Sequence, residues 1–321
     1  MPWIGSLVLV GYMVGTTDLD QVASSLTQVN VWAVLGLAVA GTAATFLVDS
    51  LSLRLTFNSF VCPITFRQTL PVKATSYFLN ILNYNAALAG MALYLKKSRN
   101  IRFWKTFGSL MFLNVVDLVV VMLTLGFGLI VNLGSDTLPP MLEYSLMLVV
   151  FGGLTGFVVG LALFKSKLQL PFLQQLRTNS LFAPLHGAGV RIWVQLGLLR
   201  LAILLLYLVA QYYFIGLFGI HVPFGRMFVY LPVLTFIGIV PISISGLGTT
   251  QIAMRKFYAP YFASGLAGAK AAIDAASTTA ILGFVFVRIL LAYFFLGEFS
   301  REVLMQARSS EGIQEGDCEH G

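Results

Sequence analysis

Hydrophobic residues follow one another along most of this chain, and polar residues gather in the short segments between the apolar stretches. Five stretches hold the ~20 residues that an α-helix needs to cross a hydrocarbon core of ~30 Å. They cover residues 31–53, 107–131, 141–164, 192–218 and 270–297. Because backbone polar groups within lipid must be hydrogen-bonded inside the protein, each stretch predicts a transmembrane helix. The pattern therefore predicts an all-α fold, a polytopic membrane helical bundle.

A shorter apolar stretch at residues 3–14 precedes these five. At 1.5 Å per residue it is about 18 Å long, which is less than the thickness of the hydrocarbon core. It has neither the basic n-region nor the small-residue cleavage site of a signal peptide. We interpret it as a shortened first span, and we assign residues 1–300 to a single transmembrane domain.

The composition points to the bilayer as the main solvent. Of the 321 residues, 58% are hydrophobic and 10% are charged, whereas about a quarter of the residues in an average soluble domain are charged. The net charge of +7 therefore indicates membrane topology and attraction to anionic lipid instead of nucleic-acid binding. We expect a multi-pass protein of the cell membrane that is not an enzyme and has no nucleic-acid partner.

The cysteines and histidines do not form a pattern typical of a metal or redox site. Cys62 lies beside a predicted loop and Cys318 in the tail, so these two cysteines suggest neither a disulfide framework nor a thiolate metal site. His186, His221 and His320 are scattered without the spacing of metal ligands or of a catalytic triad. We therefore expect no metal ion and no cofactor.

Basic residues are concentrated in three connections, which the positive-inside rule places in the cytoplasm. They are Arg54, Arg67 and Lys73; Lys96, Lys97, Arg99, Arg102 and Lys105; and Lys165, Lys167, Arg177 and Arg191. Residues 168–190 mix glutamine and arginine with leucine and phenylalanine, which predicts an amphipathic segment on the cytoplasmic surface. The acidic tail, residues 301–321, is predicted to be disordered.

Residues 74–95 are long enough to span the membrane, yet basic cytoplasmic segments flank both of their ends. Asn80, Asn83 and Asn85 in the middle offer side-chain hydrogen bonds that compete with a helical backbone. A re-entrant hairpin explains both features, and broken backbone at such depth is tolerated only against protein or a polar cavity. These amides either line that cavity or only satisfy the broken backbone.

Residues 227–264 repeat the arrangement, with a second break at residues 241–251. This break contains proline, which removes a backbone donor, glycine, which relaxes the dihedral restrictions, and hydroxyl side chains. The tripeptide Leu-Pro-Val precedes each break, at residues 70–72 and 231–233. Two hairpins from opposite faces predict an inverted repeat, which places the substrate near the membrane midplane in many transporters.

Three features of the chain resemble the flippase-like transmembrane family typified by the membrane region of lysylphosphatidylglycerol synthase, also called multiple peptide resistance factor. They are the proline, serine and glycine pattern of residues 241–251, the segment Asn83 to Leu95 ahead of Lys96 and Lys97, and Asp117 followed by Arg288 in the last span. The resemblance covers nearly the whole chain, and it implies movement of lipids or lipid-linked molecules between leaflets. The synthase carries out aminoacyl transfer in a separate soluble domain, so synthase activity is not carried over.

Two positions depart from the family pattern. Met91 and Gln251 stand where the family usually has a glutamate, and Asn85 with Ala86 replaces its expected proline region. A mechanism that relies on those carboxylates is therefore in question here.

The candidate site residues are helix-breaking, hydroxyl, amide or cationic residues at these breaks and in the last span. As lipid-headgroup or cavity residues we select Pro241, Ser243, Ser245, Gly246, Gly248, Gln251, Arg255, Lys256, Arg288, Asn80, Asn83 and Asn85. The backbone amides of a broken helix and two following cations predict a cradle for a phosphate, and the alternative is an ordinary loop with two interfacial bases. Arg288 either faces the cavity or reaches towards the interface.

Two pairs of opposite charges are also expected. Asp117 lies about 18 Å beyond Lys105 along its helix and Arg200 about 14 Å beyond Arg191, so both lie deep in the membrane. Isolated charge there is costly, so we expect these two to pair, either as a structural pair or as a transport element. Lys270 and Asp274 are predicted to form a surface pair.

The sequence favours two functions, and it also leaves open an ion-coupled carrier of small polar solutes. The first is translocation of an anionic phospholipid or a polyprenyl-phosphate-linked intermediate between leaflets. The second is a non-transporting membrane subunit that recruits or orients a lipid-modifying glycosyltransferase through the basic cytoplasmic loops. Leaflet transfer by the isolated protein distinguishes the two functions.

Overall fold

The computed structural model describes residues 27, 29–82, 84–134, 138–166, 171–239, 249–262 and 266–318. Within this part of the chain the elements are helices, apart from one isolated bridge between Ile220 and Phe262. The expected all-α class is therefore confirmed. The predicted span at residues 3–14 lies outside the described residues.

Five helices of the described chain are long and apolar enough to cross a membrane. They are α3 (Val31–Phe60), α6 (Phe103–Val131), α7 (Pro140–Lys165), α10 (Val190–Gly216) and the segment Gly268–Phe295 of α13 (Leu266–Cys318). The five predicted spans fall on these helices with shifted ends. The helix α3, for example, continues past the apolar run to Phe60, where the Asn58 side chain accepts a hydrogen bond from the Ile64 amide at 2.6 Å.

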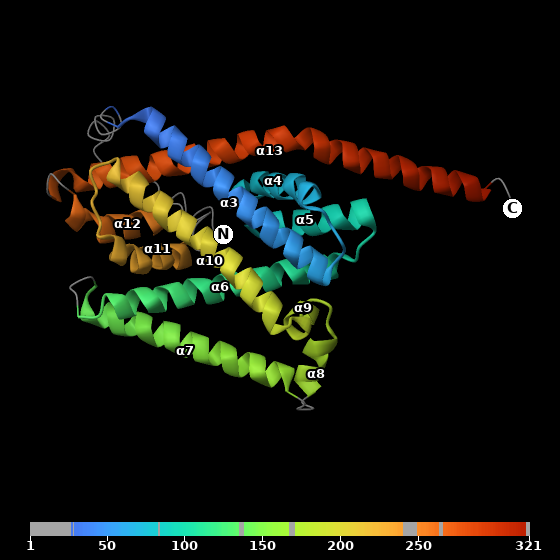
Figure 1. Cartoon of the computed structure of the whole chain (residues 1–321), viewed down its shortest axis with the longest axis horizontal. Helices are drawn as coiled ribbons and strands as arrows, with labels where there is room; N and C mark the ends of the chain where they lie inside the picture. Colours follow the sequence, from blue (N-terminus) through green and yellow to red (C-terminus); the bar gives the residue numbers. More distant parts are fainter. Residues whose placement is uncertain are drawn as a thin grey trace. The chain divides into compact units, whose positions relative to one another are not determined.

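Two pairs of shorter helices occupy the predicted hairpins. The first pair is α4 (Phe66–Leu82) and α5 (Tyr84–Arg99), and the second is α11 (Phe224–Ile239) and α12 (Thr249–Tyr258). With 17 and 16 residues, α4 and α11 are about 25 Å long, which is less than the ~30 Å core. The helices α4 and α5 lie side by side (Figure 1), with Leu79 against the backbone of Gly90.

Each of these pairs begins with a helix that contains an internal proline. The repeated Leu-Pro-Val tripeptide places Pro71 inside α4 and Pro232 inside α11. A proline inside a helix removes one backbone hydrogen bond and favours a kink, so both helices carry a weak point. The repeated tripeptide therefore occupies equivalent elements of the two pairs.

The chain divides into two compact units that are interleaved in sequence. Unit 1 contains residues 1–45, 116–168 and 200–286, and unit 2 contains residues 46–115, 169–199 and 287–321. Each unit holds one pair of short helices, which are α11 and α12 in unit 1 and α4 and α5 in unit 2. The boundaries between the units fall inside α3, α6, α10 and α13, so each unit holds a part of each of these helices.

Each unit has its own apolar core. In unit 1, Leu208, Phe214 and Met227 are among the buried residues that α10 and α11 contribute. In unit 2, Phe57 and Leu95 pack between α3 and α5. These cores position the short helices against the long ones, because the buried residues of each pair belong to the same clusters as those of the spans.

Three glycines of α7 have the spacing of a helix-packing motif. Gly152, Gly156 and Gly160 recur every four residues, a spacing that lets two helix backbones approach closely. In the described chain a Cβ added to any of these three has open space around it. The close approach occurs instead at Gly128 of α6, where an added Cβ would lie 2.5 Å from the carbonyl oxygen of Phe228 in α11.

We predict that Gly128→Ala destabilises the protein, since the new methyl group meets backbone that cannot rotate away. Overpacking of this kind costs about 1–3 kcal/mol. The matched control is Gly152→Ala in α7, which should be neutral or stabilising because alanine favours helix by about 1 kcal/mol over glycine. Thermal unfolding in detergent measures both, and equal midpoints would contradict the prediction.

The C-terminal segment differs from its prediction. The helix α13, orange to red in Figure 1, continues to Cys318, so residues 301–318 are helical where a disordered tail was expected. The physical reason is local, since residues 301–308 are mostly strong helix formers and residues 301–318 contain no proline. The predicted amphipathic segment contains the short helices α8 (Pro171–Thr178) and α9 (Ala183–Gly187).

Candidate functional site

An ion pair joins the second short-helix pair to α13. Arg255 of α12 donates from Nε to Oδ1 of Asp274 at 2.6 Å and from a terminal nitrogen to Oδ2 at 2.5 Å. The side chains of Arg255 and Asp274 are only 12% and 4% exposed. This two-point geometry is the strongest form of an arginine–carboxylate contact. Asp274 lies about 9 Å inside the apolar span that begins at Gly268.

The pair corrects one expectation from the sequence and shows the surroundings of a predicted site residue. Asp274 was predicted to pair with Lys270 at the surface, but its buried carboxylate binds Arg255. Arg255 was predicted to attract an anion together with Lys256; its guanidinium contacts Asp274, and Lys256 is exposed. The i,i+4 spacing favoured Lys270 as the partner of Asp274. Packing of α12 against α13 instead brings Arg255 to Asp274, and a guanidinium can donate two hydrogen bonds to one carboxylate.

Most of the predicted cradle lies outside the described residues. This holds for Pro241, Ser243, Ser245, Gly246 and Gly248. Gln251, in the first turn of α12, is buried.

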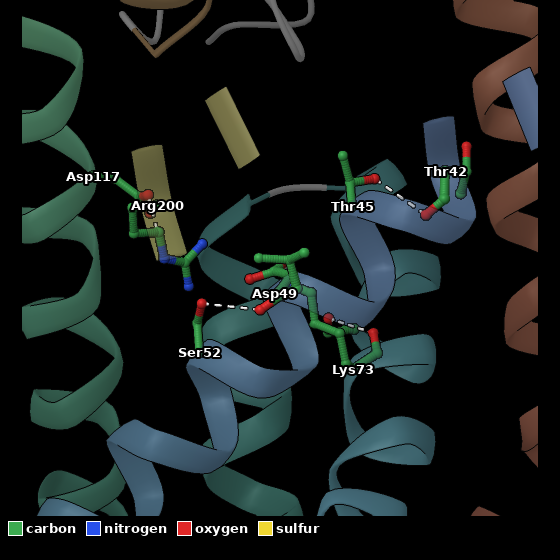
Figure 2. A network of polar contacts seen from close by, with 9 residues as sticks. Thr42, Thr45, Asp49, Ser52, Lys73, Asp117 and Arg200 are labelled. Atoms are coloured by element: carbon green, nitrogen blue, oxygen red, sulfur yellow. Dashed lines mark hydrogen bonds and ion pairs between the residues drawn. The ribbon is translucent and has the colours of Figure 1, made fainter. Parts of the chain in front are cut away.

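A second ion pair joins the first short-helix pair to α3. Lys73 of α4 contacts the carboxylate of Asp49 of α3, as Figure 2 shows. Lys73 Nζ also lies 5.2 Å from the ring centroid of Tyr77, one turn further along α4. Arg288 of α13 approaches the same ring, with Cζ 5.1 Å from its centroid. We call Asp49, Lys73, Tyr77 and Arg288 the Tyr77 cluster.

The sequence reasoning missed most of this cluster. It selected Arg288 but assigned Lys73 to a cytoplasmic basic patch and gave Asp49 no role. One signal was available, because Asp49 is an acidic residue inside the first apolar stretch, where a charge needs a partner. The identity of that partner depends on how α4 folds back beside α3, which spacing alone does not show.

The residues that follow Arg288 show on which face of α13 it lies. Leu291 and Phe295 follow it at helical spacing and pack against Phe46, Ala74 and Tyr77. Of the residues between them, Tyr293 and Phe294 are 75% and 79% exposed. Arg288 therefore lies on the inner face of α13, about 10 Å before the apolar span ends at Phe295.

A third pair joins α6 and α10. The structure brings together Asp117 and Arg200, with Arg200 Nε 3.4 Å from Asp117 Oδ1 (Figure 2). Asp117 is the central residue of α6, about 21 Å from either end. The two side chains differ in exposure, since Arg200 is 8% exposed and Asp117 is 39% exposed. One acidic side chain thus reaches the surface of the helix bundle near the middle of a span.

The family model described as the lysylphosphatidylglycerol synthase TM region matches residues 3–286. The chain belongs to this family. No curated protein matches the chain. Together with the five candidate spans, the family makes this a membrane protein and suggests a membrane-embedded, lipid-related role.

The two positions at which this family member departs from the family's glutamates are buried. Met91 is 5% exposed and packs in the apolar core of unit 2 with Phe57 and Leu95. Gln251 is 6% exposed. A carboxylate at either place would need a partner, and Met91 has apolar neighbours instead. The chain places its membrane acids elsewhere, at Asp49, Asp117 and Asp274.

The three asparagines of the first break are only partly described. Asn80 is half-buried near the end of α4. Asn83 and the side chain of Asn85 lie outside the described residues. Neither of their two predicted roles is tested.

A polar contact outside the five spans closes the loop between α10 and α11. Arg226 donates a hydrogen bond to the Tyr261 hydroxyl, which lies 3.1 Å from the Tyr230 hydroxyl. The His221 amide also donates to the Tyr261 carbonyl at 3.0 Å. The Tyr261 hydrogen bond raises the pKa of Arg226, which keeps this guanidinium charged. We assign this contact to the structure of the loop.

Proposed function

We propose that this protein moves an anionic phospholipid, or a lipid-linked intermediate of the same charge type, between the leaflets of the cell membrane. The proposal rests on one observation above all. In each unit, a cation from the pair of short helices binds an acid on a long helix, as Lys73 binds Asp49 and Arg255 binds Asp274. Charges in the hydrocarbon region are costly, and their default interpretation is a substrate or ion pathway.

The energetics of buried ion pairs support a functional interpretation over a structural one. Removing two charges from water costs several kcal/mol for each ion, and their mutual attraction recovers this only with good geometry. Well-packed apolar residues of similar volume often stabilise a protein equally well. Three such pairs in the described chain are therefore weak evidence for stability and better evidence for handling a charged group.

The short helices supply the second part of the argument. Helices too short to cross the membrane leave backbone ends at depth, where they line cavities in many transporters. Each of the two first helices also contains a proline, at Pro71 and Pro232. We propose that repacking of these helices opens the headgroup pathway to one leaflet and then to the other, while the acyl chains remain in the bilayer.

The test is leaflet transfer by the purified full chain in liposomes. Fluorescent phosphatidylglycerol and phosphatidylcholine are followed by chemical quenching of the outer leaflet. We expect selective transfer of phosphatidylglycerol, slowed about tenfold or more in the double variant Arg255→Gln, Asp274→Asn. Because this double variant removes both charges, it leaves no unpaired ion in the membrane.

Lys256→Gln is the matched control, because Lys256 is the exposed neighbour of Arg255. We expect it to transfer lipid at the unaltered rate. A folded wild-type protein that transfers no lipid would refute translocation and favour the alternative, a subunit that recruits a glycosyltransferase.

A further inference from the structure

We infer that the contact between α3 and α4 in unit 2 opens to form the path by which a lipid headgroup enters from the cytoplasmic leaflet. The path takes a phosphate-linked headgroup that carries hydroxyl groups, such as glycerol or a sugar. This inference rests on the proposed translocation, and it adds the route and the chemical class of the headgroup.

Polar side chains form a row along one face of α3. They recur at intervals of three and four residues, which keeps them on one side of an α-helix. The members are Asp49, Ser52, Thr56 and Ser59. Ser52 and Thr56 are buried. Asp49 lies about 16 Å before the end of α3 at Phe60, so the row covers about half of the ~30 Å core.

The same face of α3 continues towards its N-terminus with Thr45 and Thr42 (Figure 2). Thr42 is buried, and in the described chain its hydroxyl group has no hydrogen-bond partner. A buried hydroxyl without a partner is unfavourable in a permanently dry interior. This face of α3 therefore suits water or a polar ligand better than a purely apolar contact.

The helix α4 carries a matching row on the face that contacts α3. Its members recur at intervals of four, three and four residues, and they are Thr69, Lys73, Ser76 and Asn80. Both hydroxyl residues of this row are buried. The ion pair of Lys73 with Asp49 and the packing of Tyr77 on Phe46, with ring centroids 5.9 Å apart, align the two rows. The rows therefore run beside each other on antiparallel helices.

The hydroxyl groups of both rows donate hydrogen bonds within their own helices, over 2.7–3.0 Å. The donors and the residues whose carbonyl groups accept are Ser52 and Val48, Thr56 and Ser52, Thr69 and Phe66, and Ser76 and Lys73. The oxygen of a hydroxyl group can also accept hydrogen bonds. When α4 moves away from α3, these donors therefore stay paired, and their oxygens can accept hydrogen bonds from water or from a headgroup.

The Lys73–Asp49 ion pair joins the two rows at their inner end. Pro71 lies two residues before Lys73 and removes a backbone hydrogen bond of α4, which favours bending close to this pair. The phosphate of an entering headgroup can replace the Asp49 carboxylate as the anion next to Lys73. Opening of the path is thereby linked to arrival of the headgroup.

The outer end of the path and its walls select the headgroup. Arg54 and Arg67 are exposed near this end, and the chain has no acidic residue between Asp49 and Asp117, so the mouth attracts negative charge. Beyond the ion pair the walls carry neutral hydroxyl groups. Glycerol or sugar hydroxyls can both donate to them and accept from them, whereas a choline group offers neither donor nor acceptor.

The experiment measures how fast a water-soluble anionic methanethiosulfonate labels single cysteines of the full chain in nanodiscs, by mass spectrometry of the intact protein. Cys62→Ser and Cys318→Ser first remove the native thiols. A cysteine reacts as its thiolate, which forms in water far more readily than in lipid. We expect Ser52→Cys to be labelled about tenfold faster than Leu51→Cys. Leu51 is the matched control, because it adjoins Ser52 at the same depth and is 40% exposed, whereas Ser52 is fully buried.

Thr56→Cys tests a second position of the row, and size-exclusion chromatography verifies that each variant is folded. Dihexanoyl-phosphatidylglycerol should slow labelling of Ser52→Cys severalfold, and dihexanoyl-phosphatidylcholine should not. Labelling of Ser52→Cys and Thr56→Cys no faster than that of Leu51→Cys would overturn the inference, because the contact would then stay closed. Equal protection by the two lipids would overturn the class of headgroup.

The same variants separate this inference from the proposed function. Leaflet transfer by the unaltered protein in liposomes, without labelling of the row, would leave translocation standing and overturn the route. Labelling as expected, without leaflet transfer of any lipid, would refute translocation and leave a water-filled path between α3 and α4.

Discussion

Asp274→Leu is expected to lower the stability of the protein by about 3–5 kcal/mol, because it leaves the Arg255 guanidinium buried without its carboxylate. Both hydrogen bonds to Asp274, at 2.6 and 2.5 Å, are lost together. A guanidinium does not give up its proton inside a protein, so the Arg255 side chain stays charged. In thermal unfolding we expect the midpoint to fall by on the order of 10 °C.

The double variant Asp274→Leu, Arg255→Met separates the charge effect from the loss of packing. Replacing a buried ion pair with apolar residues is often neutral or stabilising, so we expect near wild-type stability. Lys270→Leu is the matched control, since Lys270 is the exposed residue that spacing alone pairs with Asp274. If Lys270→Leu were as harmful as Asp274→Leu, the Arg255 assignment would be wrong.

Asp117→Leu is expected to destabilise the protein by about 3–5 kcal/mol, and Arg200→Leu by clearly less. The difference follows from exposure, because Arg200 is 8% exposed and Asp117 is 39% exposed. Without Asp117, a permanently charged guanidinium stays buried. Without Arg200, the carboxyl group has access to the surface of the bundle and can accept a proton, which makes it neutral.

The measurement compares the loss of stability in Asp117→Leu with that in Arg200→Leu, from their thermal midpoints in the same detergent. The double variant Asp117→Leu, Arg200→Leu should recover most of the loss, as expected for two residues that act as a pair. Equal effects of the two single variants would show that the difference in exposure does not govern the energetics of this pair.

The Arg255–Asp274 and Lys73–Asp49 pairs each join one helix of a short pair to one long helix. In unit 2, Arg288 of α13 also approaches the ring of Tyr77, next to Lys73.

The spans of the bundle could be predicted closely from the sequence. An apolar run of ~20 residues has few alternatives to a transmembrane helix, because lipid cannot satisfy exposed backbone groups. The charges at Asp117 and Arg200 were also predictable, since each has a definite depth along a known helix and an isolated charge there needs a partner. The ends of helices were less predictable, because helix propensity continues α3 and α13 beyond their apolar runs.

The sequence by itself determined that this protein lies in a membrane, and it predicted two broken hairpins and the pairing of acids with bases. Only the tertiary structure decided the partners, placing Arg255 on Asp274 and Lys73 on Asp49 and turning Arg288 towards Tyr77. The physical reason is that partition into lipid is a local property of the sequence and ion pairing is not. Partition between water and lipid depends on each segment alone, whereas a salt bridge depends on the approach of helices distant in sequence, which core packing sets.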